Sequence, residues 1–304
     1  MSDRTLEGLP WWAKRLDELS GHFSRQGLGG LLDHHRVTNA LGEAIAIGGV
    51  TPEELLVWIQ AQVASRMSVG PSPDSALQDP WAAYNADPRA FWEQVWEEIL
   101  GRKIEIPPVP KLKGKTKKAI ERYKLMLVFL PKITEDDYPG SFIKPAWGRY
   151  IGEASIERRP LPGRWVLAEM IDKPNWDDQS GYKDDLLGQD LGLTTRFKIS
   201  WDHLTASLLP KAAKLLGLAK PSVRQPTLEE RNLTANLFNW LREHRGLDLP
   251  DLDSTNSWEW CLNVYASSNR LFTGHRDRGG LSSVNGFWSG DENDHITFRV
   301  LAVL

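Results

Sequence analysis

The sequence predicts an α+β protein with a helical N-terminal region, residues 1–103, and a C-terminal domain of strands, helices and long loops. Apolar residues recur at helical spacing in the first hundred positions, whereas the second half has short apolar runs separated by turn residues. The 304 residues also include 14 Trp, 25 Gly and 19 Pro. Since Trp buries a large apolar area, we expect a loop-rich fold held by aromatic rings.

Composition excludes several classes of protein. Hydrophobic residues make up 41% of the chain and charged residues 25%, which is typical of soluble globular proteins. A net charge of −3 argues against a protein whose entire surface attracts nucleic acid. A single cysteine, Cys261, excludes an internal disulfide framework and a thiolate-rich metal site. No apolar run is long enough for a membrane span, and no signal peptide is evident. We expect a cytoplasmic protein, or a component of a phage particle if it is viral.

Two helices are expected in the N-terminal region. Thr51-Pro52-Glu53-Glu54 is typical of a helix start, with Thr51 as N-cap. A second helix is predicted to begin at Asp87-Pro88 and to end at Gly101. The apolar stripe of this second helix comprises Phe91, Trp92, Val95, Trp96 and Ile99.

Residues 104–124 are predicted to be a connector. A Pro-rich stretch, Ile106–Pro110, favours an extended and stiff chain. A basic run follows, with Lys111, Lys113, Lys115, Lys117, Lys118, Arg122 and Lys124. The run fits a phosphate-binding patch or a solvated linker entering a helix. We favour the linker, and nucleic-acid binding through this connector stays an alternative function.

The second half carries signals for both strands and helices. The apolar run Trp165–Ile171 predicts a buried strand. Ser200 or Asp202 is expected to cap a helix that Pro210 kinks or restarts. Thr227-Leu228-Glu229-Glu230 forms a capping-box pattern, and Leu233, Leu237, Trp240 and Leu241 then follow on one helix face. The apolar C-terminus, Phe298–Leu304, is expected to dock as a strand buried on both faces.

Four motifs stand in the order of a known superfamily. They are Val223–Glu230, Trp258-Glu259-Trp260, Arg278-Gly279-Gly280 and Phe298-Arg299-Val300. Together they resemble the formylglycine-generating-enzyme superfamily over residues 148–304. The resemblance implies a C-type-lectin fold, with a small twisted antiparallel sheet, two helices, long loops and neighbouring terminal strands. We assign residues 125–304 to this domain. Thr297 and Leu281 depart from the family pattern around the last turn.

The motif residues are interpreted as scaffold. Arg224 is expected to form a bidentate pair with a buried carboxylate, Glu230 or Glu259. Trp258 and Trp260 should point the same way if their segment is extended. The complete predicted scaffold set is Arg224, Pro226, Thr227, Glu230, Trp258, Glu259, Trp260, Gly279, Gly280, Phe298 and Arg299.

Catalysis is not expected. The resemblance implies that catalytic relatives use two cysteines to hold copper, and this chain has one, Cys261. Iron-dependent relatives need three clustered histidines, and the seven histidines here show no ligand spacing. We therefore predict no catalytic residues, no metal site and no cofactor. A formylglycine-generating-enzyme-like oxidoreductase is retained as an alternative.

The remaining branch of the superfamily comprises the variable proteins of diversity-generating retroelements, which bind ligands through diversified C-terminal side chains. Asn263–His295 resembles such a hypervariable region. It contains no Lys, Gln or Met, although 28 of the 304 residues are of these types, and adenine-directed change of AAC codons cannot produce them. Trp288 and Glu292 cannot arise from such codons either, so both are expected to be fixed or to come from another codon type. An ordinary polar loop is the alternative interpretation.

The diversified side chains are expected to project from one face and to bind a protein or another macromolecule. The predicted ligand-binding residues are Asn263, Tyr265, Ser267, Asn269, Arg270, His275, Asp277, Asn285, Phe287, Trp288, Ser289, Asp291 and Asn293. Phe272 and Val284 are the aromatic and aliphatic residues of this region most expected in the core. The N-terminal region is expected to link this face to an assembly partner.

Overall fold

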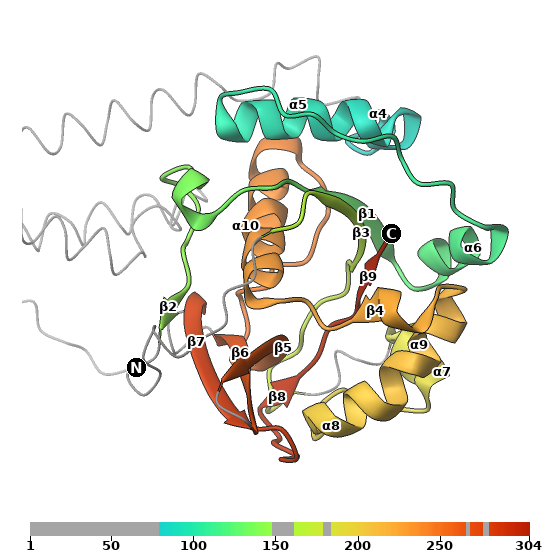
Figure 1. The fold of residues 1–304 in the computed structure, drawn as a ribbon, viewed down its shortest axis with the longest axis vertical. Coiled ribbons are helices and arrows are strands. Elements are labelled where there is room, and N and C mark those ends of the chain that lie inside the picture. The colour runs from blue at the N-terminus through green and yellow to red at the C-terminus, as the bar shows by residue number, and fades with distance from the viewer. Residues whose placement is uncertain (1–78, 148–160, 179–183, 266–267, 276–279) are drawn as a thin grey trace, which may run out of the picture. The chain divides into compact units, whose positions relative to one another are not determined.

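A computed structural model describes residues 79–147, 161–178, 184–265, 268–275 and 280–304, which belong to one compact unit, residues 79–304 (Figure 1). The helix start predicted at Thr51 and the turn glycine Gly279 lie outside the described residues. The described part contains both helices and strands, so the predicted α+β class is confirmed.

A four-stranded antiparallel sheet lies at the centre of this unit. Its strands, in spatial order, are β1 (Leu125–Leu130), β3 (Arg164–Glu169), β9 (Leu301–Val303) and β4 (Val223–Arg224). Every residue of β1 is buried, as expected for a strand covered on both faces. The predicted strand at Trp165 is confirmed. The C-terminal strand predicted over Phe298–Leu304 is present but shorter, Leu301–Val303, and two of its three residues are buried. Strand β3 lies between β1 and the C-terminal strand β9.

A second sheet contains much of the predicted ligand-binding region. Its order is β2 (Ala146–Trp147), β7 (Gly280–Trp288), β6 (Asn269–His275), β5 (Trp258–Tyr265) and β8 (Ile296–Thr297). The three central strands are antiparallel, and both edge strands pair in parallel. The single sheet implied by the family resemblance is therefore replaced by two small sheets.

Helix α10 (Leu228–Arg245) contacts both sheets, and Figure 1 shows it running through the middle of the unit. The predicted capping box is confirmed: the Thr227 hydroxyl accepts from the Glu230 amide at 3.2 Å, and the Glu230 carboxylate accepts from the Thr227 amide at 2.8 Å. Every residue from 228 to 238 is buried, which is the pattern of a helix enclosed on all sides.

Helices α4 (Ala82–Ala86) and α5 (Pro88–Leu100) belong to the same unit as the strands. The Nε1–H groups of Trp92 and Trp96 donate to the β1 carbonyls of Leu127 and Phe129, each at 2.9 Å. The predicted apolar stripe of α5 is confirmed, because all five of its side chains are buried. The boundary predicted after residue 103 is corrected to residue 78, since this stripe completes the core over β1.

The remaining helices lie along one side of the four-stranded sheet (Figure 1). They are α6 (Gly114–Arg122), α7 (Leu186–Leu191), α8 (Trp201–His203) and α9 (Leu209–Leu216), with a π-helical turn at Leu204–Leu208 and a 3₁₀ turn at Lys220–Ser222. Another 3₁₀ turn, Glu135–Asp137, follows β1. The resemblance implies two helices in the C-terminal domain, but the described part of residues 125–304 has four. Within the described residues, no helix combines the length and apolarity needed to cross a membrane.

Candidate functional site: a ligand-binding surface on the five-stranded sheet

The register of β6 and β7 assigns the predicted ligand-binding residues to faces. Asn269 pairs with Trp288, Arg270 with Phe287, and Phe272 with Asn285, without interruption. Paired residues share a face, and successive residues alternate between faces. The prediction of a single face is therefore wrong: Asn269 and Trp288 belong to one side of the sheet, and Arg270, Asn285 and Phe287 to the other.

The first face packs against the start of α10. Leu271 of β6 and Val284 of β7 are completely buried with Leu228 and Cys261, and Tyr265 packs against this group. Burial raises the pKa of the Cys261 thiol far above its usual range. The thiol is therefore protonated and inert at neutral pH, which fits a core side chain.

The second face carries a more open surface. The guanidinium of Arg270 lies 4.2 Å from the centre of the Trp201 ring, within the range of a cation–π contact. Phe287 is 41% exposed beside it, and Asn285 is half-buried. We define the open face as Trp201, Arg270, Asn285 and Phe287.

The aromatic rings beneath the open face are held by hydrogen bonds and ring contacts. The Nε1–H of Trp260 donates to the Ile199 carbonyl at 2.9 Å, and that of Trp201 donates to the Cys261 carbonyl at 3.1 Å. Trp258 and Trp260 both contact the ring of Phe272 edge-on, at 4.9 and 5.7 Å, so the prediction that they point the same way is confirmed. These contacts give the open face a rigid base.

Trp288 is the most exposed large apolar side chain in the described part, at 59%. Its ring passes Gly290, where an added Cβ would lie 3.1 Å from the ring. The next residue, Ser289, joins this end of β7 to α8: its hydroxyl donates to the Asp202 carboxylate at 3.1 Å, and its carbonyl accepts from the Asp202 amide at 3.1 Å. Trp288 therefore stands on an anchored strand end.

Three predicted ligand-binding residues are buried, and their assignment to a free surface is wrong. Asn263 is fully buried against the start of α10, where its side-chain oxygen accepts from the Leu228 amide at 2.7 Å. His275 is 7% exposed, with its ring 5.1 Å from that of Trp258. Ser289 is also 7% exposed, because of its bonds to α8.

The other predicted residues divide by exposure. Six are half-buried: Tyr265, Asn269, Arg270, Asn285, Asp291 and Asn293. Two more, Ser267 and Asp277, lie outside the described residues. Phe272 and Val284 are core residues, as predicted. Sequence reasoning missed Trp201, because its place beside Arg270 depends on a contact between segments about 70 residues apart.

Beneath the sheets lies a buried ionic network built from the scaffold motifs. Arg224 forms the predicted bidentate pair, with both of its distances to Glu230 at 2.7 Å. Glu259 instead pairs with Arg231 at 2.6 Å and with Arg299 at 2.7 Å. Burial alone would raise the pKa of Glu259, but Arg299, Arg231 and Lys173 outweigh it and hold that pKa at about 2. Glu259 is therefore a charged structural anchor.

Lys173 and Arg196 extend this network. Lys173 donates from its fully buried ammonium to the carbonyls of Ser257 and Gly274, and burial lowers its pKa to about 7. Arg196 bridges Glu169 and Asp185, with its closest contacts at 2.6 and 2.5 Å. Lys173 therefore joins the loop after β3 to the start of β5 and the end of β6, and Arg196 joins the end of β3 to the start of α7.

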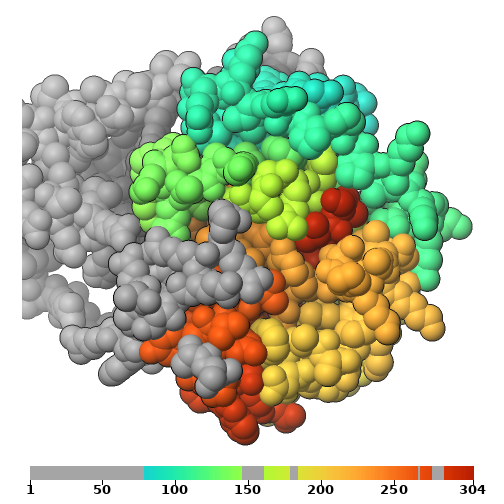
Figure 2. Space-filling model, viewed as in Figure 1, coloured from blue at the N-terminus to red at the C-terminus, as the bar shows by residue number. Residues whose placement is uncertain are grey.

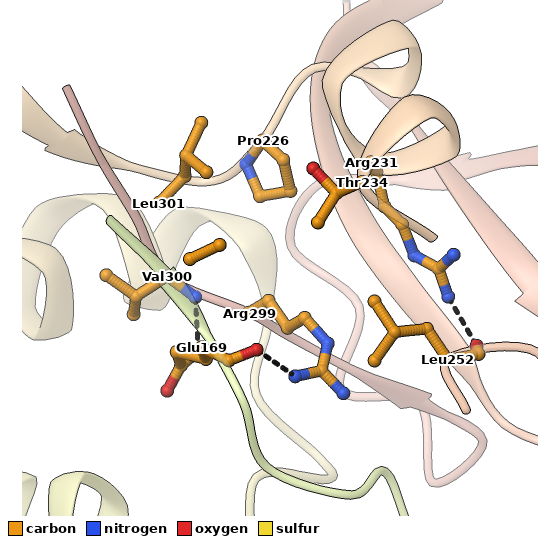
Figure 3. Close-up of a pocket in the computed structure, with 9 residues that line it drawn as sticks. Glu169, Pro226, Arg231, Thr234, Leu252, Arg299, Val300 and Leu301 are labelled. Atoms are coloured by element: carbon orange, nitrogen blue, oxygen red, sulfur yellow. Dashed lines mark hydrogen bonds between the residues drawn. The ribbon is translucent and has the colours of Figure 1, made fainter. Parts of the chain in front are cut away.

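A small cavity borders the network (Figure 3). It measures about 20 Å³ and is lined mostly by apolar atoms, including those of Pro226, Val300 and Leu301. Its volume is room for one water molecule, well below the several hundred Å³ typical of ligand pockets. Two hydrogen bonds connect residues of the cavity wall. The Val300 amide donates to the Glu169 carboxylate at 2.6 Å, and Arg231 donates to the Leu252 carbonyl at 2.7 Å.

The described residues offer few acidic or histidine side chains close to one another. No group of three or more His, Cys, Asp or Glu side chains is placed there to hold a metal ion. The carboxylates that are buried together, Glu169, Asp185 and Glu259, are each bonded to arginine. Their chemistry is that of structural ion pairs.

Comparisons with known proteins found similarity among solved structures. No family model matches the chain, and no curated protein matches it. The solved structure of Treponema denticola variable protein 1 aligns over 59% of this chain and 95% of its own, with 11% sequence identity and a TM-score of 0.35. A similarity at that level establishes neither fold nor function, so the functional argument rests on the residues themselves.

Proposed function

We propose that residues 125–304 form a C-type-lectin-like domain that binds a protein or another macromolecule without catalysis, and that a diversity-generating retroelement varies its surface side chains. One observation carries the proposal. Phe287 and Trp288 are exposed aromatic side chains, and the half-buried cationic and amide side chains of Arg270 and Asn285 belong to the same pair of strands, β6 and β7. Rigid aromatic anchors surrounded by adaptable polar groups are the composition of binding surfaces that tolerate change.

The division of the sheet into two faces refines this proposal. The positions that suit diversification are exposed or half-buried, as at Asn269, Arg270, Asn285 and Phe287. Asn263, His275 and Ser289 suit a fixed role, because each is buried. Trp288 belongs to the surface but is expected to be invariant, since adenine-directed change of an AAC codon cannot produce Trp.

Inspection of the DNA beside the gene tests the retroelement. We expect a near-copy of the codons for residues 263–295 that differs almost only at adenines, close to a reverse-transcriptase gene. The substituted adenines should fall in codons of accessible residues and spare those of buried ones. A gene without such a copy, or differences concentrated in buried codons, contradicts diversification.

A library tests the surface itself. Randomising Asn269, Arg270, Asn285 and Phe287 should leave most variants folded, because these side chains contribute little to the core. A matched library at Asn263, His275, Glu259 and Trp260 should unfold most variants, since each is buried. The readout is the melting temperature of individually purified clones. Equal losses in both libraries would contradict a tolerant surface.

A further inference from the structure

Helices α6 and α9 bring together a basic surface that the sequence shows only in part. Nine exposed lysines lie on these two helices or within a few residues of their ends, and we call them the lysine surface: Lys111, Lys113, Lys115, Lys117, Lys118, Lys124, Lys211, Lys214 and Lys220. The two helices pack side by side, and the Lys115 side chain passes so close to Gly217 that an added Cβ there would lie 3.0 Å from it. Figure 2 shows this part of the chain at the right edge of the molecule.

The charge of the lysine surface is strongly one-sided. Residues 111–124 and 209–220 contain ten Lys and Arg residues and one acidic residue, Glu121, which gives a local charge of +9 (10 − 1). The chain as a whole carries −3, so the remaining residues carry −12 (−3 − 9). Asp190, next to this surface, is bonded to Arg122 at 2.9 Å and to the Tyr123 hydroxyl at 2.8 Å. The ammonium groups of the nine lysines form no ion pair or hydrogen bond with any other residue that the structure describes.

We propose that the lysine surface binds the phosphate backbone of double-stranded DNA, independently of the ligand-binding surface on the five-stranded sheet. Unpaired ammonium groups on exposed side chains are what backbone neutralisation requires, and each phosphate contact releases a counterion. Lysine contacts of this kind position a protein on the duplex without reading its sequence.

The composition of the lysine surface favours double-stranded DNA over single-stranded nucleic acid, a membrane or a protein as its ligand. Single-strand binders stack bases on exposed aromatic rings, but Tyr123, the aromatic residue in this stretch, is buried. Membrane-surface helices pair basic residues with exposed apolar ones, and the exposed large apolar residues of the described part, Leu186, Phe287 and Trp288, are not among those that form this surface. Protein interfaces are depleted in lysine.

Binding of the full chain to a 20-base-pair duplex of arbitrary sequence tests the proposal. With at least six lysines in contact, the slope of log K against log salt should be about −5 or steeper. The triple variants Lys113→Gln/Lys117→Gln/Lys118→Gln and Lys211→Gln/Lys214→Gln/Lys220→Gln should each make that slope shallower by about 2 to 3. Since both helices contribute, neither triple variant alone should behave like the unchanged protein.

A matched control removes the same charge elsewhere. Lys103, Lys132 and Lys144 are exposed lysines outside the lysine surface, and their triple change to Gln should leave the slope unchanged. Melting temperatures of all three variants should match the parent, because every substituted side chain is exposed. The proposal is overturned by absence of duplex binding at 50 mM salt, by equal loss in the control, or by preference for duplex RNA or phosphatidylserine vesicles.

Discussion

At the scale of single residues, the buried charges of the Glu259 network are expected to affect the stability of the fold more than the exposed charges do. Glu259 lies between Arg231 and Arg299, and Lys173 adds a third cation nearby. A buried carboxylate of this kind is costly to lose, because the remaining cations are then buried without compensation. The Trp-Glu-Trp motif therefore supplies both an aromatic support and the counter-charge that lets two arginines stay in the interior.

Replacing this carboxylate should show its structural role. Glu259→Gln should lower the free energy of unfolding by about 3–5 kcal/mol at pH 7. A folded pKa of about 2 lies below the unfolded value, so the wild-type contribution is present above about pH 4.3 and disappears as the pH falls toward 2. Chemical denaturation across pH 2–7 should show the two proteins converging in acid. Glu243→Gln, at an exposed site, is the control and should change little.

Lys173 should leave a signature of the same sign in a more alkaline pH range. Its folded pKa of about 7 lies below the unfolded value of about 10.4, so the unfolded chain binds the additional proton between these values. The free energy of unfolding should therefore gain up to about 1.4 kcal/mol per pH unit from this residue as the pH rises from about 7 to 10. Lys173→Met should remove that slope, as measured by urea denaturation. Parallel curves for the two proteins would show that Lys173 does not titrate in this range.

At the scale of elements, the start of α10 is stabilised by its own capping box and by side chains from two neighbouring strands. Its capping box supplies acceptors for the backbone amides of Thr227 and Glu230. Arg224 holds the capping carboxylate of Glu230 in a bidentate pair. The side-chain oxygen of Asn263 then accepts from the Leu228 amide. The start of this helix is therefore joined both to β4 and to β5, which links the two sheets.

The cap itself can be tested without touching these links. Thr227→Ala should lower the free energy of unfolding by about 1 kcal/mol, because the Glu230 amide loses its acceptor. Thr227→Ser retains a hydroxyl and should stay close to wild type. Thermal and urea denaturation of both variants give the comparison. An alanine variant as stable as the serine variant would mean that water replaces the cap.

At the scale of the whole molecule, residues 79–304 form one compact unit. In this unit, helix α5, which comes early in the sequence, covers strand β1 of the four-stranded sheet. The indole N–H groups of Trp92 and Trp96 bond to β1, and the α5 stripe covers that strand. The connector is correspondingly more than a linker, because Thr116 and Ala119 of α6 are buried. Removing α5 would expose the apolar face of β1.

This packing predicts where the chain can be cut. A fragment of residues 79–304 should fold alone and unfold in a single cooperative transition. A fragment beginning at residue 104 should be aggregated or partly folded, since it lacks the side chains that cover β1. Circular dichroism and size-exclusion chromatography distinguish the two. A stable, monomeric 104–304 fragment would contradict the assignment of α5 to this core.

The sequence by itself determined the features that depend on neighbouring residues. It predicted the α5 stripe and its Gly101 end, the strand at Trp165, the capping box and the buried C-terminus, because caps and periodicity act over a few positions. Tertiary structure decided the rest. Strand register placed Asn269 and Asn285 on different faces of the sheet, the start of α10 covered Asn263, the Trp258 ring packed beside His275, and α6 came to lie next to α9 in the lysine surface. Each of these follows from contacts between distant segments, whose pairing and register no local pattern specifies.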